Sequence, residues 1–354
     1  MGPTPAAAEW PMALPQDEGF APDLVERLAT GLRSGMLPDI HAVLVARGGR
    51  MVLEHYGSGR DEAWGRDLGQ VTFGSDVLHD LRSVTKSVVG LLYGIALDRE
   101  LVPPPDAPLL AAFPEYPDLV ADPARARITV GHVLGMTMGT DWDEMSAPYT
   151  DPRNSEIAME RAPDRLRFVL GGRMVKPPGQ DWTYSGGAMA VIGALIARGT
   201  GKTLQDFAAE ALFTPLGIAR FEWARGADEV ASAASGLRLL PRDLLRIGTL
   251  VLAGGKVAGR QVVSRAWLEA SLRPMVPAFG EVRYGRLWYV GERPVLGVAR
   301  TWVAGFGNGG QRLWVMPSVD LAVVITAGRY NKPDQSVAPI KIWREIILAS
   351  IVKA

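Results

Sequence analysis

The fold is decided by residues 83–97, which have the sequence SVTKSVVGLLYGIAL. From Val88 onward nearly every side chain is apolar, so the segment predicts a helix that is buried on most of its sides and ends before Pro103. A helix without a broad polar face must pack against other elements in several directions. We therefore expect residues 83–97 to form a helix of the protein core.

Strand patterns occur on both sides of this helix in the sequence. Before it, two β-rich runs at 40–46 and 50–56 are separated by Gly48 and Gly49, which predicts an antiparallel hairpin. After about residue 235, further strands are predicted at 284–290, 300–304, 311–316 and 321–326, with a turn at 317–320. The remaining periodic segments predict helices at 22–36, 155–170, 187–198, 204–212, 242–253, 265–272 and 337–352.

This distribution of elements predicts the fold class. Strands at both ends of the chain with helices between them indicate an α+β fold, in which one antiparallel sheet from the N- and C-terminal segments is flanked by helices and carries an inserted, mostly helical lobe. We expect a sheet lobe of residues 12–82 plus 235–354 and a helical lobe of residues 83–234. The active site is expected between them.

The composition excludes several classes of protein. The 354 residues carry 38 basic and 38 acidic side chains, and this balance gives no reason to expect a nucleic-acid partner. The absence of cysteine excludes disulfides, a thiolate nucleophile and iron–sulfur clusters. Without an apolar run of about 18 residues or more, we expect a soluble protein with no membrane partner, located in the cytoplasm or, after signal removal, in the periplasm. The oligomeric state stays open.

Ser83 and Lys86 form a chemically suggestive pair at the start of the core helix. Three residues apart, they share one face of the helix, where an amine held neutral can accept the proton of the hydroxyl. The helix N-terminus also offers N–H groups and positive potential to a developing oxyanion. A capping role would explain Ser83 but not Lys86, because a cation in the first turn opposes the helix dipole. The second S-x-x-K pair, Ser350 and Lys353, lies in the last residues and has no such surroundings.

Two later segments fit the same chemistry. The turn PPGQDWTYSGG at 177–187 places Tyr184 just before another apolar helix, where a phenol near an ammonium can be stabilised as phenolate and act as the base. The segment AGFGNGGQ at 304–311 contains glycines that allow its backbone to approach a ligand closely and to supply a second oxyanion N–H. The four histidines, His41, His55, His79 and His132, have no spacing partner for a metal site or triad, so we predict structural roles for them.

The order of these three motifs resembles the serine β-lactamase and penicillin-binding-protein-like hydrolase superfamily. Four supporting segments resemble it too, at 128–139, 178–179, 212–217 and 241–244. The sequence YTDP at 149–152 and the Gly-Gly-Gln ending at 309–311 are most similar to the branch that contains 6-aminohexanoate-dimer hydrolases and related carboxylesterases.

The resemblance implies roles for individual residues. Ser83 would be the acylated nucleophile, Lys86 and Tyr184 would share the proton transfers, and the backbone amides of Ser83 and Gly307 would form the oxyanion hole. It implies neither a metal nor an organic cofactor. Substrate contacts are expected from Tyr149, Trp182, Ser185, Gly186, Phe306 and Asn308, and an apolar or aromatic acyl pocket is expected near Trp142, Trp182 and Trp302.

Two positions depart from the family pattern. The polar third residue of its Tyr-x-Asn or Tyr-x-Ser motif is replaced by Gly186, and Ser185 or a water could substitute for the missing side chain. Ala304 stands where many β-lactam-recognising relatives have Lys or His, so the cation that would bind a substrate carboxylate is missing. We therefore expect poor turnover of penicillins, whereas esters and amides without that carboxylate are still accommodated.

These observations lead to one expected function and two alternatives. We expect a serine hydrolase that acts on a small-molecule ester or amide, either a carboxylesterase or an amidase of the 6-aminohexanoate-oligomer type. The first alternative is a β-lactamase or D-alanyl-D-alanine peptidase-like enzyme. The second is a non-catalytic binding or sensor protein that retains the fold.

Overall fold

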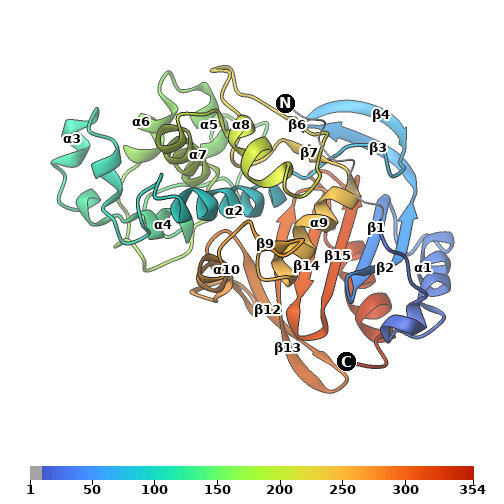
Figure 1. Ribbon diagram of the computed structural model, residues 1–354. Helices are drawn as coiled ribbons and strands as arrows, with labels where there is room; N and C mark the ends of the chain where they lie inside the picture. Colours follow the sequence, from blue (N-terminus) through green and yellow to red (C-terminus); the bar gives the residue numbers. More distant parts are fainter. Residues whose placement is uncertain (1–9) are drawn as a thin grey trace.

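A large antiparallel sheet organises the computed structural model, which describes residues 10–354 (Figure 1). Its eight strands lie in the order β10-β11-β12-β13-β14-β15-β1-β2. Their bounds are β1 (Ile40–Arg47), β2 (Arg50–Tyr56), β10 (Val276–Phe279), β11 (Val282–Tyr284), β12 (Tyr289–Val295), β13 (Val298–Gly307), β14 (Gln311–Met316) and β15 (Leu321–Ala327). Because β1 pairs with both β2 and β15, the N-terminal hairpin is joined to the C-terminal strands, which confirms the predicted fold class.

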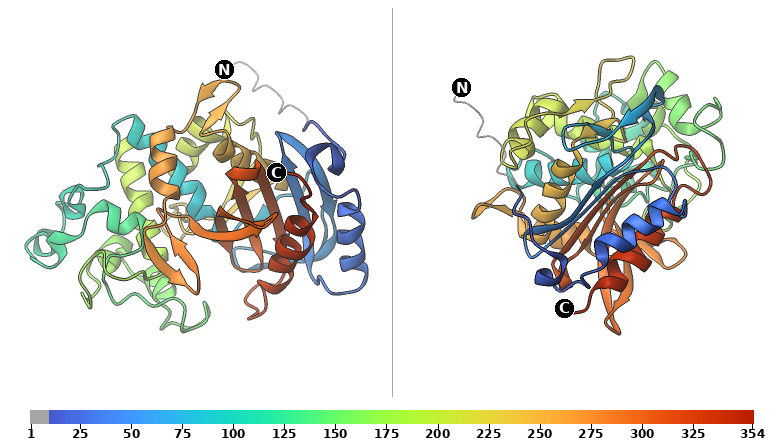
Figure 2. Two further views of the ribbon diagram at one scale, coloured as in Figure 1. Left: turned by 90° about the horizontal axis from the view of Figure 1, so that it is seen from below. Right: turned by 90° about the vertical axis from the view of Figure 1, so that its right-hand side faces the viewer.

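Helices cover both faces of the sheet (Figure 2). Helix α9 (Pro241–Leu252) packs on one face, where Gly248 lies against Leu313 of β14. On the other face, the next β14 residue, Trp314, stacks at 5.1 Å on Trp343 of the C-terminal helical segment. Successive strand side chains point to opposite faces, so these two contacts define two helical layers. The second layer contains α1 (Leu24–Arg33), α11 (Val337–Lys341) and the π-helical turn Ile342–Ile347.

A group of helices gathers around α2 (Val84–Asp98) beside the sheet (Figure 1). Thirteen of the fifteen α2 residues are buried, as expected for a core helix. The other helices are α3 (Pro117–Val120), α4 (Val130–Leu134), α5 (Ser155–Arg161), α6 (Arg165–Leu170), α7 (Gly186–Thr200), α8 (Leu204–Ala208) and α10 (Arg265–Leu272). None of the helices described in residues 10–354 is long and apolar enough to cross a membrane. The exact lobe boundaries stay a prediction.

Two predicted elements are divided in the structure. The predicted strand 284–290 is wrong, because β11 ends at Tyr284 and β12 begins at Tyr289, with Leu287 in the left-handed region at a φ of 63°. The predicted helix 155–170 is interrupted between α5 and α6, where Pro163 lacks an amide hydrogen and keeps Ala162 extended. Both interruptions come from single residues inside otherwise regular patterns.

Several short strands escaped prediction. The hairpin β3 (Ser58–Ala63) and β4 (Arg66–Thr72) is rich in charged residues and glycine and so lacks the usual alternation. A small sheet joins β5 (His79–Asp80), β6 (Glu222–Trp223) and β7 (Leu237–Leu239), and β8 (Lys256–Val257) pairs with β9 (Arg260–Gln261). Because β5 directly precedes residues 81–83, its pairing with β7 fixes the segment that leads into α2.

Candidate active site

The turn before α2 holds Ser83 in a defined position. Arg82 has a left-handed backbone with a φ of 47°, a conformation that a residue with a side chain rarely adopts. The buried Asp80 carboxylate stabilises this turn by accepting hydrogen bonds from the Arg82 amide at 2.8 Å and the Trp64 amide at 2.7 Å. The Ser83 side chain makes no capping hydrogen bond to the helix. Its hydroxyl therefore remains available to the side chains opposite.

Lys86 is the direct neighbour of the Ser83 hydroxyl. Its side-chain nitrogen lies 3.0 Å from Ser83 Oγ and donates a second hydrogen bond of 2.9 Å to the carbonyl oxygen of Ala234. The side chain is buried, and burial lowers its pKa, whereas the charges of Glu144 and Glu156 oppose this shift. A lowered pKa favours the neutral amine, which is the form that can accept a proton.

Tyr184 completes the group from the loop before α7. The Lys86 nitrogen lies 4.7 Å from the centre of the Tyr184 ring, over its face. Burial and the charge of Glu144 hold the pKa of Tyr184 well above its usual value, although a hydrogen bond with the Ser83 side chain opposes the shift. The three predicted catalytic side chains thus lie together, with the tyrosine favoured as a neutral phenol.

Strand β13 approaches the start of α2 through two glycines. A Cβ built on Gly305 would lie 3.0 Å from Ser87 Oγ, and one built on Gly307 would lie 2.5 Å from the carbonyl oxygen of Leu81. At Gly307 the facing atom belongs to the backbone, so only glycine permits this close packing of the strand on the residues that precede Ser83. The buried Arg312 donates a 3.0 Å hydrogen bond to the Gly307 carbonyl and fixes the strand end. Gly307 is therefore positioned beside the Ser83 segment.

Two acidic residues near this group were missed by the sequence analysis. Glu144 is buried, and its carboxylate accepts hydrogen bonds from the Gly186 amide at 2.5 Å, Trp142 Nε1 at 2.7 Å and the Tyr149 hydroxyl at 3.2 Å. Burial, followed by the charge of Glu144, raises the pKa of Glu156 to about 8. Glu144 lies seven residues after Thr137 and belongs to no recognisable motif, so only the fold shows that it acts on Lys86.

These carboxylates also explain the glycine in the tyrosine motif. A Cβ on Gly186 would lie 2.8 Å from Glu156 Cδ and 3.2 Å from Glu144 Oε2. A side chain at this position would therefore collide with both acidic residues. The neighbouring Ser185 does not fill the gap, because its Oγ caps α7 by accepting a hydrogen bond from the Ala188 amide at 3.0 Å.

Of the predicted substrate contacts, Trp182 and Phe306 belong to an aromatic cluster beside Tyr184. The Trp182 ring centre lies 5.9 Å from that of Tyr184 and 6.3 Å from that of Tyr289. Phe306 stacks on Tyr289 with 4.7 Å between ring centres, and Trp302 lies 6.0 Å from Phe306. Trp182, Phe306 and Trp302 thus belong to one aromatic cluster, and their contact with a substrate stays a prediction.

Two other predicted positions are occupied by internal contacts. The Asn308 amide donates to Asn331 Oδ1 at 3.0 Å, and Asn308 Oδ1 accepts from the Asn331 backbone amide at 2.8 Å. Ala304 is fully buried in the ladder between Tyr289 and Trp314. By strand alternation its side chain points to the face opposite Gly305 and α2, so this position offers neither a cation nor a contact on the Ser83 side.

Three buried residues could in principle donate to a metal ion. One ligand atom each from His41, Asp61 and His79 lies within 4.8 Å of the others. His79 Nδ1 bonds the Asp80 carbonyl at 3.0 Å and therefore carries its proton, so His79 Nε2 accepts the 2.9 Å hydrogen bond from His41 Nδ1. The Tyr330 hydroxyl donates to Asp61 at 2.7 Å. These bonds already engage the facing nitrogens, and we interpret the cluster as structural.

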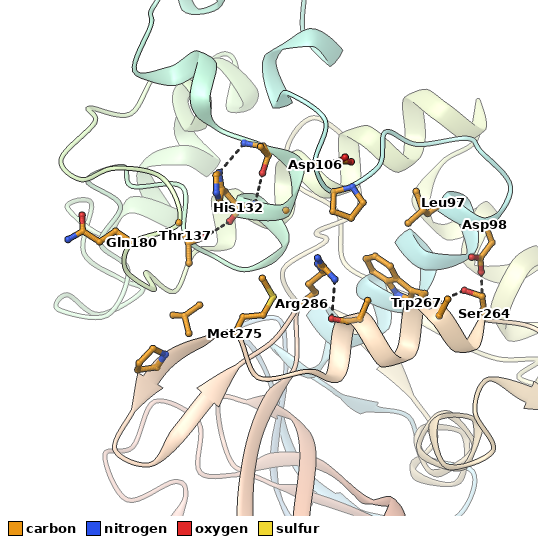
Figure 3. Close-up of a pocket in the computed structure, with 18 residues that line it drawn as sticks. Leu97, Asp98, Asp106, His132, Thr137, Gln180, Ser264, Trp267, Met275 and Arg286 are labelled. Carbon is orange, nitrogen blue, oxygen red and sulfur yellow. Dashed lines mark hydrogen bonds between the residues drawn. The ribbon is translucent and has the colours of Figure 1, made fainter.

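A cavity of about 770 Å³ lies near the far end of α2 (Figure 3). Polar side chains in its lining already form hydrogen bonds within the protein. Asp98 accepts one from the Ser264 amide at 2.9 Å, and Arg286 donates one to the Ala270 carbonyl at 3.0 Å. His132, also in the lining, forms a capping box with Thr129 at the start of α4, in agreement with its predicted structural role. Neither Ser83 nor Tyr184 lines this cavity, so it is separate from the candidate site.

Comparisons with known proteins identify similar chains and folds. A curated 6-aminohexanoate-dimer hydrolase from Paenarthrobacter ureafaciens is 28% identical over 345 residues, which cover 88% of this chain and 76% of the relative. The solved structure of EstCE1, a hydrolase with promiscuous acyltransferase activity, superimposes with a TM-score of 0.70 at 17% identity, over 94% of this chain and 98% of that one. A family VIII carboxylesterase gives a TM-score of 0.66 at 14% identity, over 96% and 99% of the two chains.

At these identities the two solved structures establish the fold alone. The family assignment comes from the Beta-lactamase family model, which matches residues 26–344 and so covers every element of the candidate site. The antiparallel sheet, the buried helix behind Ser83 and the strand that ends at Gly307 all lie within the matched region. The chain therefore belongs to the Beta-lactamase family, whose fold is that of serine hydrolases.

Proposed function

We propose that this protein is a serine hydrolase that cleaves a small ester or amide through an acyl-enzyme on Ser83. The observation that carries the proposal is the 3.0 Å contact between Lys86 Nζ and Ser83 Oγ. It is supported by the Tyr184 ring 4.7 Å from the same nitrogen. A hydroxyl beside a buried amine and a phenol is the arrangement required to activate a serine nucleophile.

The directions of the pKa shifts favour a division of labour between the two proton-transfer groups. Burial lowers the pKa of Lys86 and raises that of Tyr184, so the neutral amine is the better base and the phenol the better relay. Lys86 accepts the Ser83 proton as Oγ attacks the substrate carbonyl. When the bond to the leaving group breaks, Tyr184 donates its hydroxyl proton to that group and is reprotonated by Lys86, which returns to the neutral amine. The amides of Ser83 and Gly307 hold the oxyanion, and water then releases the acyl group.

The substrate class follows from the aromatic cluster and from Ala304. An uncharged or aromatic acyl group would contact Trp182, which lies beside Tyr184, and Ala304 provides no cation to bind the carboxylate of a β-lactam. The relative from Paenarthrobacter ureafaciens is a 6-aminohexanoate-dimer hydrolase, which makes linear aminohexanoate amides candidates beside simple esters. The Beta-lactamase family match keeps a β-lactamase or D-alanyl-D-alanine peptidase as the second candidate.

One panel of substrates tests these functions together. Short-chain nitrophenyl esters, a linear aminohexanoate amide and a chromogenic cephalosporin are incubated with wild type and Ser83→Ala, and a fluorophosphonate probe reports on the nucleophile. We expect ester or amide turnover and probe labelling in wild type only. Preferential cephalosporin turnover would support the second candidate. Absence of both labelling and turnover would support a non-catalytic binding or sensor protein.

A further inference from the structure

Position 186 leaves a gap in the tyrosine motif that another part of the chain fills. The two carboxyl groups that occupy this space, those of Glu144 and Glu156, belong to the segment between α4 and α6. The Gly186 amide donates directly to Glu144 Oε2 at 2.5 Å. The acidic side chain is thus anchored to the backbone at the position where the family pattern has a polar side chain.

Three hydrogen bonds fix the Glu144 carboxyl group. Burial raises its pKa, whereas the charge of Lys86 and these hydrogen bonds oppose the shift and favour the carboxylate. Its three donors, Gly186, Trp142 and Tyr149, come from the backbone of α7, an indole and a phenol, and none of them carries a positive charge. Hydrogen bonds from neutral donors stabilise a carboxylate without neutralising it. The charge therefore remains available to act on the next polar group, which is Lys86.

Five groups surround the Lys86 amine. Ser83 Oγ and the Ala234 carbonyl are hydrogen-bonded to it, the Tyr184 ring lies under it, and the charges of Glu144 and Glu156 raise its pKa against the effect of burial. Of the two carboxyl groups, Glu144 has the larger influence. No other titratable group is identified as acting on Lys86 in the described residues.

Glu156 is the weaker counter-ion for a second reason. Burial and Glu144 raise the pKa of Glu156 to about 8, so at neutral pH it is mostly protonated and uncharged. The charge of Glu160 raises the pKa of Glu156 further, and the charge of Arg165 lowers it. Neither of these two residues is among the groups that shift the pKa of Lys86. Glu144 is therefore the carboxyl group with the larger influence on the amine.

We propose that Glu144 is a positioning residue that replaces the missing third side chain of the tyrosine motif and stabilises the ammonium form of Lys86 during acyl transfer. The inference rests on the proposed function. When the Ser83 proton moves to Lys86 Nζ, the Oγ–H bond breaks and an N–H bond forms. The Oγ electron pair attacks the carbonyl carbon of the substrate, and the π electrons of the C=O bond move to its oxygen, which becomes the oxyanion. Glu144 exchanges no proton, and its charge compensates the ammonium until the proton leaves for the departing group.

The substitution Glu144→Gln tests this role with little change in shape. The amide oxygen of glutamine can still accept from Gly186 and Trp142, while the negative charge is lost. We expect kcat to fall about 10- to 100-fold with KM changed less than threefold, since a counter-ion acts on the ionised transition state. In the plot of kcat/KM against pH, the rise on the acidic side (the acidic limb) should move to lower pH by about one unit, because an amine without its counter-ion has a lower pKa.

Two further variants separate charge from structure. Glu144→Asp keeps the charge and should keep the acidic limb within about 0.3 units of wild type, whatever its kcat. Glu156→Gln removes the carboxyl group with the smaller influence on Lys86 and should move the acidic limb less than Glu144→Gln does. Thermal unfolding of each variant shows whether it is folded.

Three outcomes decide the question. A shifted limb in Glu144→Gln, restored in Glu144→Asp, supports the proposal. A loss of kcat without a shift of the limb, or an unchanged kcat, overturns it and leaves Glu144 with a structural role only. If wild type itself shows neither turnover nor fluorophosphonate labelling, the proposed serine hydrolase function has failed, and with it the basis of this inference.

Discussion

The side-chain nitrogen of Lys86 lies over the face of the Tyr184 ring, 4.7 Å from its centre, and at the same time 3.0 Å from Ser83 Oγ. The negative face of an aromatic ring attracts a cation without accepting a proton from it. The ring of Tyr184 can therefore stabilise the amine, and the hydroxyl of the same residue is free for proton transfer. The two contributions can be separated by mutation.

Tyr184→Phe should remove the proton transfer and keep the ring. We expect kcat to fall about 10²- to 10⁴-fold, with KM nearly unchanged, because the loss is one of general acid–base catalysis. Steady-state kinetics on the best ester or amide provide the measurement. Tyr289→Phe is the matched control, since Tyr289 belongs to the same buried aromatic cluster. A Tyr184→Phe enzyme with wild-type kcat would remove this hydroxyl from the mechanism.

Lys86→Ala should show that the amine and the phenol act as a unit. The single variant is expected to lower kcat about as much as Tyr184→Phe, and the double variant only slightly more, because residues in one proton pathway are not additive. The same kinetic assay, applied to all three variants, gives the comparison. Fully multiplicative effects in the double variant would indicate independent roles instead.

Gly307→Ala should displace the strand end from the segment that carries Ser83. The added methyl group would lie 2.5 Å from the Leu81 carbonyl oxygen, a backbone atom that cannot rotate away. We expect kcat to fall about 10²- to 10³-fold, as for loss of one oxyanion donor. In the control Gly305→Ala the new methyl group faces the Ser87 and Val84 side chains at 3.0 Å, which can adjust. Equal kcat values in the two variants would contradict the special position of Gly307.

The sequence predicted those features that depend on local pattern. The hairpin at Gly48 and Gly49, the buried helix after Ser83 and the turn that delivers Tyr184 all follow from short-range signals, and the structure contains each of them. The order of the motifs indicated the family, which the match over residues 26–344 confirms. Local patterns and motif order together were sufficient for the architecture.

The features that escaped prediction depend on contacts between distant segments. Glu144 reaches Gly186 across 42 residues, and Tyr330 reaches Asp61 across 269 residues, and neither contact leaves a periodic signal in the chain. The sequence analysis singled out Gly186 as a departure from the resembled motif, but Glu156, which occupies the space beside it, comes close to it only in three dimensions. A departure from a motif therefore located the relevant position without identifying the group that compensates for it.

Gly186→Ala should be destabilising because of one specific collision. The new Cβ would lie 2.8 Å from Glu156 Cδ, and overpacking of this kind lowers the free energy of unfolding by about 1–3 kcal/mol. Shortening the opposing side chain in Glu156→Ala opens the required space. In a double-mutant cycle measured by urea unfolding, we expect a favourable interaction energy of about 1 kcal/mol or more. Additive effects would show that the collision with Glu156 is not the cause.

The buried pair His41 and His79 should make the protein sensitive to acid. Burial, the largest cause, lowers the pKa of His41 to about 3 and that of His79 to about 4, whereas both have a pKa of 6.5 in the unfolded chain. Between these values the unfolded state binds more protons, so the stability contributed by the neutral rings is complete above pH 6.5 and is lost as the pH falls toward 4. At pH 5 the loss approaches about 2 kcal/mol for each ring.

His41→Gln tests this linkage by removing one of the two titrating rings. Glu156 has a raised pKa and titrates in the opposite sense, so the quantity to compare is the difference in unfolding free energy between wild type and variant at each pH. We expect the variant to lose less stability than wild type between pH 7 and pH 5, by urea unfolding at fixed temperature. His55→Gln serves as the control, because its ring is only half-buried. Parallel pH curves for wild type and His41→Gln would show that the buried histidine pair does not determine the acid sensitivity.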